Sequence, residues 1–144
     1  MFTKEKIFQI SLLLLAAIGL ANSLIIYQKI SGNIFVPCLI GQGCDNVLYS
    51  VYSKFIGVPL SLWGIVFYSA YFICVAFFLI KPNKISLNIV AGIVLLGFGF
   101  SLRLIYLQVF VIKSLCSYCL VSSFVVCASL FLVILIKQKS RLFS

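Results

Sequence analysis

Residues 113–137 read KSLCSYCLVSSFVVCASLFLVILIK, and this stretch joins a Cys-x-x-Cys pair to a long uncharged apolar run. The run over residues 116–136 matches the length of about 20 apolar residues that a membrane-spanning helix needs. Cys116 and Cys119 lie at its beginning, where a helix places both sulfurs within one turn. The stretch therefore predicts a transmembrane helix that presents two thiols near one membrane surface.

Three further segments have the same apolar character: residues 7–26, 59–80 and 85–112. The chain is 64% hydrophobic and 9% charged, whereas soluble domains average about 45–50% apolar and about 25% charged residues. We therefore expect an all-α membrane protein, a four-transmembrane-helix bundle that forms a single domain over residues 1–144. The first segment could instead be a signal peptide, but its apolar run is longer than the usual signal core, which favours a retained helix.

Basic residues are distributed unevenly between the two ends of this bundle. The end that holds both termini is expected to carry Lys4, Lys6, Lys81, Lys84, Lys137, Lys139 and Arg141, and the other end Lys29, Lys54 and Lys113. Because basic residues concentrate on the cytoplasmic side, both termini are predicted to be cytoplasmic and the cysteines to face outward. Topology and contact with the lipid bilayer then explain the net charge of +9, and no basic face favours nucleic-acid binding.

The long connector between the first two membrane helices is the outer loop, residues 27–58. Asp45 is a suitable N-cap for a short helix over residues 46–55, because its carboxylate can accept a hydrogen bond from a free backbone N–H. Apolar side chains recur at helical spacing through that segment. We therefore expect a short outer-loop helix that lies on the membrane surface over the bundle.

Cys38 and Cys44 form a second close pair within the outer loop. The other pair, Cys116 and Cys119, opens a helix, where unpaired N–H groups and the helix dipole stabilise a thiolate. Two dithiols on one face of a membrane, in a compartment that permits oxidation, indicate thiol–disulfide exchange. Taken alone, the loop pair is explained equally well by a purely structural bridge.

Other site types find little support in the composition. The chain has no histidine, and its carboxylates are Glu5 and Asp45, so we predict no metal site. Four cysteines could bind zinc, but outside the cytoplasm such a site would compete with oxidation. Cys74 and Cys127 fall inside apolar segments, where we expect them to be small buried hydrophobic residues.

A relay of two dithiols must pass its electrons to an acceptor, and the sequence contains no nucleotide-binding motif. A quinone dissolved in the bilayer is the simplest acceptor, and Cys119, one turn deeper than Cys116, is its expected contact. Aromatic residues that either line an apolar pocket for it or pack in the core are Trp63, Phe67, Tyr68, Phe98 and Phe100. Arg103 is a costly charge in an apolar segment, and we expect it to reach the outer headgroups, the acceptor or loop carbonyls.

Three motifs occur in a specific order along the chain: CDNVLYS at residues 44–50, GVPLSLWG at 57–64 and CSYC at 116–119. They resemble, in turn, the loop cysteine followed by a serine, the entry into the second helix and the redox motif of the vitamin K epoxide reductase family. The resemblance is to the small bacterial form of that family and covers nearly the whole chain.

This resemblance implies a four-helix bundle around a quinone, either ubiquinone or menaquinone. It implies that Cys119 contacts the quinone, that Cys116 exchanges with Cys38, and that Cys44 meets an external protein. Ser50 would help to hold the site at the quinone end. Some bacterial members carry a fused thioredoxin-like domain, and the expected partner here is a separate thioredoxin-fold dithiol oxidase on the outer side of the membrane.

Two interpretations from different classes follow. The first is an enzyme of the bacterial inner membrane, a quinone-dependent thiol–disulfide oxidoreductase that reoxidises its partner and so supports disulfide bond formation. The relative potentials of partner and quinone set its direction, so the reverse reaction is included. The second is a non-enzymatic membrane scaffold or transporter subunit, whose inert disulfides only brace the outer loop.

Overall fold

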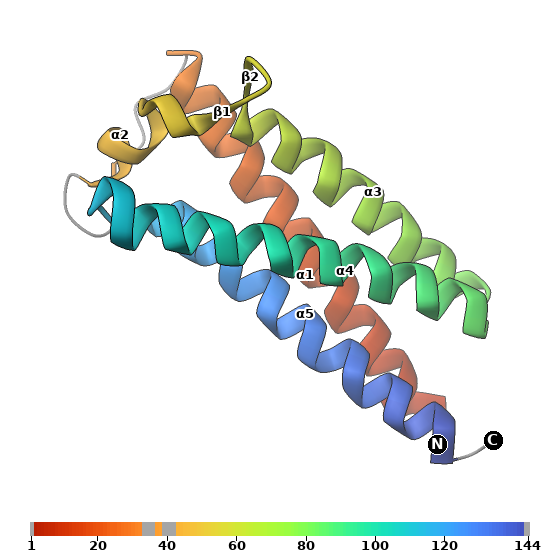
Figure 1. Cartoon of the computed structure of the whole chain (residues 1–144). Helices are drawn as coiled ribbons and strands as arrows, with labels where there is room; N and C mark the ends of the chain where they lie inside the picture. The colour runs from red at the N-terminus through yellow and green to blue at the C-terminus, as the bar shows by residue number, and fades with distance from the viewer. Residues whose placement is uncertain (1, 33–36, 39–42, 143–144) are drawn as a thin grey trace.

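Four long helices build the chain, which the computed structural model describes over residues 2–32, 37–38 and 43–142. They are α1 (Phe2–Ile30), α3 (Leu60–Ile80), α4 (Lys84–Tyr106) and α5 (Ser117–Leu142). Figure 1 shows them as an elongated bundle, and all four are long and apolar enough to cross a membrane. The predicted four-helix membrane bundle is confirmed, and the first and last helices extend beyond their apolar runs.

A core of tightly packed apolar side chains fills the bundle. Leu12 of α1, Val75 of α3 and Val90 of α4 are completely buried. The approach of α1 to α3 depends on Gly19, because a Cβ there would collide with the ring of Tyr68. Many other large apolar side chains are exposed on the outside of the bundle, and an apolar surface of this extent suits a lipid environment.

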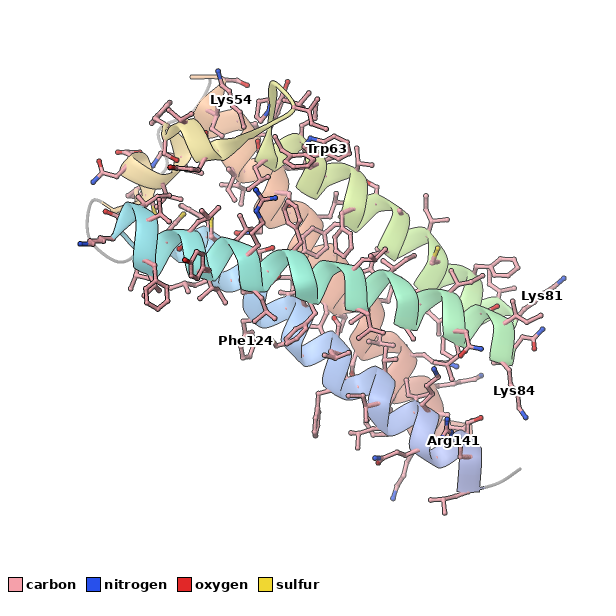
Figure 2. The ribbon with its side chains drawn as sticks, in the orientation of Figure 1. Lys54, Trp63, Lys81, Lys84, Phe124 and Arg141 are labelled. Carbon is pink, nitrogen blue, oxygen red and sulfur yellow. A yellow bond between two sulfur atoms is a disulfide. The ribbon has the colours of Figure 1, made fainter. Side chains whose placement is uncertain are left out.

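The two ends of the bundle differ in charge and in structure. Figure 2 shows Lys81, Lys84 and Arg141 at the end that holds the chain termini, and Lys54 at the opposite end. At the first end, Lys139 of α5 forms an ion pair of 3.6 Å with Glu5 of α1. The opposite end carries the connector between α1 and α3 (Figure 1).

This connector contains α2 (Gly43–Leu48), a short 3-10 turn η1 (Val51–Ser53) and the strands β1 (Lys54–Phe55) and β2 (Val58–Pro59). The strands pair antiparallel, with Phe55 opposite Val58. The short helix expected between the first two membrane helices is confirmed.

The bounds predicted for that helix, residues 46–55, are wrong. The helix begins earlier, so Asp45 lies inside its first turn and is not its N-cap. It ends at Leu48, and the chain then reverses at Ile56 and Gly57, whose φ angles are +55° and +77°. A turn with two positive φ angles joins antiparallel strands, and glycine adopts it without strain. The 3-10 turn η1 and the first strand of the hairpin therefore replace the second half of the predicted helix.

The third membrane span also departs from a regular helix near its end. Its last six residues, Leu107–Ile112, form the π-helical segment η2. The segment ends at Lys113 in the left-handed conformation, and the backbone N–H groups of Lys113 and Ser114 both donate to the carbonyl of Gln108. This closure turns the chain sharply and delivers it to the start of α5.

Candidate redox site

Cys116 occupies the cap position at the start of α5. Its carbonyl accepts the first helical hydrogen bond, 3.0 Å from the N–H of Leu120. Its own N–H donates to Oε1 of Gln108, 3.1 Å away. The end of one membrane span therefore fixes the beginning of the next, and the Cys-x-x-Cys pair lies where the sequence predicts it.

The thiols of Cys116 and Cys119 interact directly. Cys116 is completely buried, Cys119 is half-buried, and neither is in a disulfide. The pKa of Cys116 is lowered from 9.0 to about 7, chiefly because the Cys119 thiol donates a hydrogen bond to it. The backbone N–H groups of Cys119 and Tyr118 and the charge of Lys29 lower this pKa further, and together these effects outweigh burial. Cys116 is therefore the sulfur best able to act as a thiolate.

The loop pair, Cys38 and Cys44, forms a disulfide whose Cα atoms are 6.0 Å apart. Cys44 is completely buried, whereas Cys38 is half-buried. The Cys38 sulfur lies 3.8 Å from Oγ of Ser117. The Tyr118 hydroxyl donates to the carbonyl of Pro37 at 2.9 Å. Side chains from the first turn of α5 thus hold the loop disulfide close to the helix pair.

The four cysteines gather in one apolar group, which we call the cysteine cluster. Its members are Ile26, Ile30, Cys38, Cys44, Val47, Leu48, Ile112, Cys116, Tyr118 and Cys119. Gly43 allows α2 to touch the chain just before α5, since a Cβ on it would lie 2.5 Å from the carbonyl oxygen of Leu115. The fold therefore brings both predicted dithiols together.

An ion pair fixes the loop helix from the other side. Lys29, near the end of α1, has a side chain only 10% exposed and lies 2.9 Å from a carboxylate oxygen of Asp45 in α2. The predicted capping residue thus anchors its helix to α1. The same lysine places positive charge near Cys116.

A cavity of about 420 Å³ opens beside the cysteine cluster, enclosed by the membrane helices, η2 and the outer loop. Cys119 lines it, and so does Ser50, whose Oγ donates to the carbonyl of Val47 at 2.8 Å. The aromatic residues that line it are Tyr52, Phe55, Trp63, Phe67, Tyr68 and Phe100. Of the aromatics singled out in the sequence, Phe98 packs against the bundle core instead.

The cavity wall also contains polar side chains that the sequence did not single out, Gln108 and Ser61 among them. Gln108 is 2% exposed and Ser61 is 7% exposed. Within the described part of the chain, Nε2 of Gln108 and Oγ of Ser61 have no hydrogen-bond partner. The signal for Gln108 was available, because it is an amide within the third apolar segment. Polar side chains are costly inside a membrane span, so those that occur there often belong to a functional site.

The model of the vitamin K epoxide reductase family matches residues 10–134 of this chain. The chain belongs to the vitamin K epoxide reductase family. A search of curated proteins gives no match. Membership supports an oxidoreductase role, and both cysteine pairs lie within the matched residues. The four apolar helices fit an integral membrane protein of this family.

Arg103 lies next to the main cavity, in a smaller pocket that shares Phe55 with it. It is exposed, and its guanidinium lies 5.8 Å from the ring centre of Phe55, close enough for a cation–π contact. It lines a neighbouring pocket of about 100 Å³, to which Phe55 also contributes. The lining of the main cavity comes from other residues. Among the described residues Arg103 therefore contacts a loop aromatic, and its expected contact with the headgroups, the acceptor or loop carbonyls stays a prediction.

The remaining cysteines lie apart from the cysteine cluster. Cys74 is half-buried and packs against the bundle core, whereas Cys127 is exposed on α5. The prediction of a buried residue is therefore wrong for Cys127, because its side of α5 faces outward. In the described residues, no group of three or more histidine, cysteine, aspartate or glutamate side chains could hold a metal ion.

Proposed function

We propose that this chain is a membrane thiol:quinone oxidoreductase that oxidises a thioredoxin-fold dithiol partner and passes the electrons to a membrane quinone. One observation carries the proposal: Cys119 lines an apolar cavity and at the same time packs in the cluster with the other three cysteines. Cys119 thus lies between a cavity that could hold an apolar acceptor and the loop disulfide of Cys38 and Cys44.

The cavity suits the quinone ring in size and in polarity. Its lining is largely apolar, and among the fully buried atoms of the described residues it includes Nε2 of Gln108 and Oγ of Ser61, which have no partner. A quinone has an apolar ring with two carbonyl oxygens, so it offers a hydrogen-bond acceptor at each of two points. Ser50 lines the same cavity and contributes to its outer wall. Ubiquinone and menaquinone share these features.

The first step is thiol–disulfide exchange at the outer face. A partner thiolate attacks one sulfur of the Cys38–Cys44 disulfide, and its second thiol then resolves the mixed disulfide. The partner loses two electrons and two protons, and the loop pair gains them as two thiols. Cys38 is the more accessible sulfur, since Cys44 is completely buried. We therefore assign the partner-facing role to Cys38, the reverse of the order that the resemblance implies.

The second step moves the electrons inward. The loop dithiol reduces a Cys116–Cys119 disulfide, and the loop closes again as a disulfide. Cys44 and Cys116 are both completely buried in the cysteine cluster, which favours them as the exchanging sulfurs. The pairing in the structure, a loop disulfide beside two helix thiols, corresponds to the product of this step.

In the last step the Cys116–Cys119 dithiol donates two electrons and two protons to the quinone, closing as a disulfide and leaving a hydroquinone. The pKa of about 7 leaves Cys116 about half ionised near neutral pH, so the thiolate is available for exchange. When Cys116 is ionised, the hydroquinone takes its second proton from water. Cys119 shares its own proton with that thiolate and lies at the cavity wall. Its position makes Cys119 the sulfur that faces the acceptor.

We place this site on the outer side of a bacterial inner membrane, with both chain termini in the cytoplasm. The support is the charge distribution: Lys81, Lys84 and Arg141 lie at the end of the bundle away from the cysteine cluster (Figure 2). Basic residues concentrate on the cytoplasmic side of membrane proteins. An oxidising compartment on the outer side would keep the loop disulfide available for exchange.

The test uses purified protein in detergent with a reduced thioredoxin-fold dithiol protein and a soluble quinone, followed by quinone absorbance. Quinone loss that needs both Cys116 and Cys119 is the expected result. Cys127→Ala is the matched control, because this exposed α5 cysteine lies outside the cysteine cluster, and its activity is expected to equal that of the unmodified protein. Unchanged quinone reduction in the Cys119→Ala variant would contradict the proposal. No turnover, with a loop disulfide that resists the partner, favours the scaffold interpretation.

A further inference from the structure

Resting on the proposed function, we infer that Gln108 is the residue that binds a quinone carbonyl, donating a hydrogen bond from Nε2 beside Cys119. Gln108 and Cys119 line the same cavity. The oxygen of the Gln108 amide, Oε1, already accepts a hydrogen bond from the backbone N–H of Cys116. One side chain therefore connects the acceptor site to the start of α5.

The orientation of the Gln108 amide follows from its contacts. The N–H of Cys116 needs an acceptor, and Oε1 of Gln108 provides it at 3.1 Å. An amide nitrogen could only donate, so it could not replace Oε1 at this contact. Nε2 is consequently the end of the amide that has no partner among the described residues.

The backbone of Gln108 is held as firmly as its side chain. Its carbonyl accepts hydrogen bonds from both Lys113 and Ser114 at the end of η2. The backbone that carries the amide is thus fixed, and the amide itself is held through Oε1 by the N–H of Cys116. A donor fixed in advance gives up little entropy when a ligand binds.

Burial makes the unpaired nitrogen informative. Gln108 is only 2% exposed, and Nε2 has no partner within the described part of the chain. A buried N–H group without an acceptor is costly, and nearly all such groups in proteins are paired. An acceptor supplied by a ligand in the cavity removes that cost, and a quinone carbonyl is such an acceptor.

The same contact would also assist the reduction. Negative charge grows on a quinone carbonyl oxygen as electrons arrive, and a fixed N–H donor stabilises that charge. Gln108 acts here as a binding residue, since the electrons and protons come from Cys116 and Cys119. A matching role for Ser61 is consistent with its unpaired hydroxyl, but that hydroxyl rotates and is not fixed in orientation.

The experiment measures binding, without turnover. Trp63 is the chain's one tryptophan and lines the cavity, so its fluorescence reports ligand binding directly. The probes are a short-chain naphthoquinone and the corresponding naphthalene, which has no carbonyl. Gln108→Met is expected to weaken naphthoquinone binding by roughly fivefold to tenfold, the effect of one lost hydrogen bond, and to leave naphthalene binding unchanged.

Gln9→Met is the matched control, because it makes the same change at a buried glutamine of α1 that lies outside the cavity wall. Equal affinity of Gln108→Met and the unmodified protein for naphthoquinone would overturn the inference. Loss of both ligands in Gln108→Met would also overturn it, because the residue would then only maintain the cavity. If the unmodified protein binds no naphthoquinone, the proposed function itself fails along with the inference.

A second measurement does not depend on the variant folding. The infrared carbonyl bands of naphthoquinone bound to the unmodified protein are expected to include one shifted to lower frequency by a hydrogen bond. Bound quinone with both carbonyl bands unshifted would contradict the assignment. In Gln108→Met, a shifted band that persists would point to another donor and overturn it as well.

Discussion

At the scale of single residues, the site depends on the environment of the Cys116 thiol. The helix start predicts a lowered pKa, because backbone N–H groups face the sulfur. The structure adds a stronger cause, the hydrogen bond that the Cys119 thiol donates. Lys29 contributes from another helix, α1, where it also forms an ion pair with Asp45 of the outer loop.

We predict that Cys116 titrates near pH 7 in the reduced protein. Because its pKa in the fold is below the ordinary 9.0, the thiolate adds stability that is complete above about pH 9 and is lost as the pH falls through about 7. Thiolate absorbance in the ultraviolet, measured against pH and corrected with Cys116→Ala, tests this. Cys119→Ala should raise the midpoint toward 9.0, because it removes the main hydrogen bond, whereas Cys127→Ala should not move it.

A second residue-scale prediction concerns the two loop cysteines. In a Cys38→Ala/Cys119→Ala double variant, Cys44 and Cys116 should form a stable disulfide, because both are buried in the cysteine cluster. In Cys44→Ala/Cys119→Ala, Cys38 should instead trap the partner as a mixed disulfide. Mass spectrometry of the cross-linked peptides distinguishes the two. The opposite pattern would restore the order implied by the family resemblance.

At the scale of elements, the decisive contact is between α2 and the turn that precedes α5. Gly43 begins α2 and lies against the backbone of Leu115, with no room for a side chain. Backbone atoms cannot rotate away as a flexible side chain can. This contact sets how closely the loop disulfide approaches the helix pair.

We predict that Gly43→Ala lowers stability by about 1–3 kcal/mol, the usual cost of overpacking, and slows exchange between the two cysteine pairs. The added methyl would lie 2.5 Å from the Leu115 oxygen, so α2 must shift outward. Thermal unfolding in detergent and single-turnover kinetics measure the two effects. Gly99→Ala in α4 is the matched control, because nothing lies near its added Cβ. Equal behaviour of the two variants would show that α2 has no close contact there.

At the scale of the whole molecule, the bundle separates two chemically different ends. The cysteine cluster and the cavity lie at the end that carries the outer loop, and the chain termini with Lys81 and Lys84 lie at the other (Figure 1, Figure 2). The apolar helices between them are long enough to cross a membrane, which would place the thiols and the basic end on opposite sides of it.

This separation predicts an asymmetric labelling pattern in intact cells. Lys54→Cys, in the hairpin of the outer loop, should react with a membrane-impermeant maleimide. Lys81→Cys, in the turn between α3 and α4, should react only after the membrane is opened. Both are made in a Cys127→Ala background, and the unsubstituted background measures labelling of the native cysteines. Labelling of Lys81→Cys from outside would reverse the proposed orientation.

The sequence by itself determined the four membrane spans, the short loop helix and the position of the Cys-x-x-Cys pair at a helix start. These features depend on the length of apolar runs and on the spacing of neighbouring residues, which are local properties. The charge pattern along the chain predicted the orientation in the same way. The loop helix was placed at the wrong residues, because it ends at Leu48 and a 3-10 turn and a strand follow where the apolar spacing continues.

Only the tertiary structure decided how distant parts of the chain meet. Cys38 lies beside Ser117 across 79 positions of sequence, and Gln108 reaches Cys116 because η2 closes into a tight turn. Cys44 and Nε2 of Gln108 are likewise buried because the outer loop packs against the membrane helices. Such contacts depend on the shapes of facing surfaces and on the backbone space at Gly19 and Gly43. Residue spacing within one segment cannot specify them.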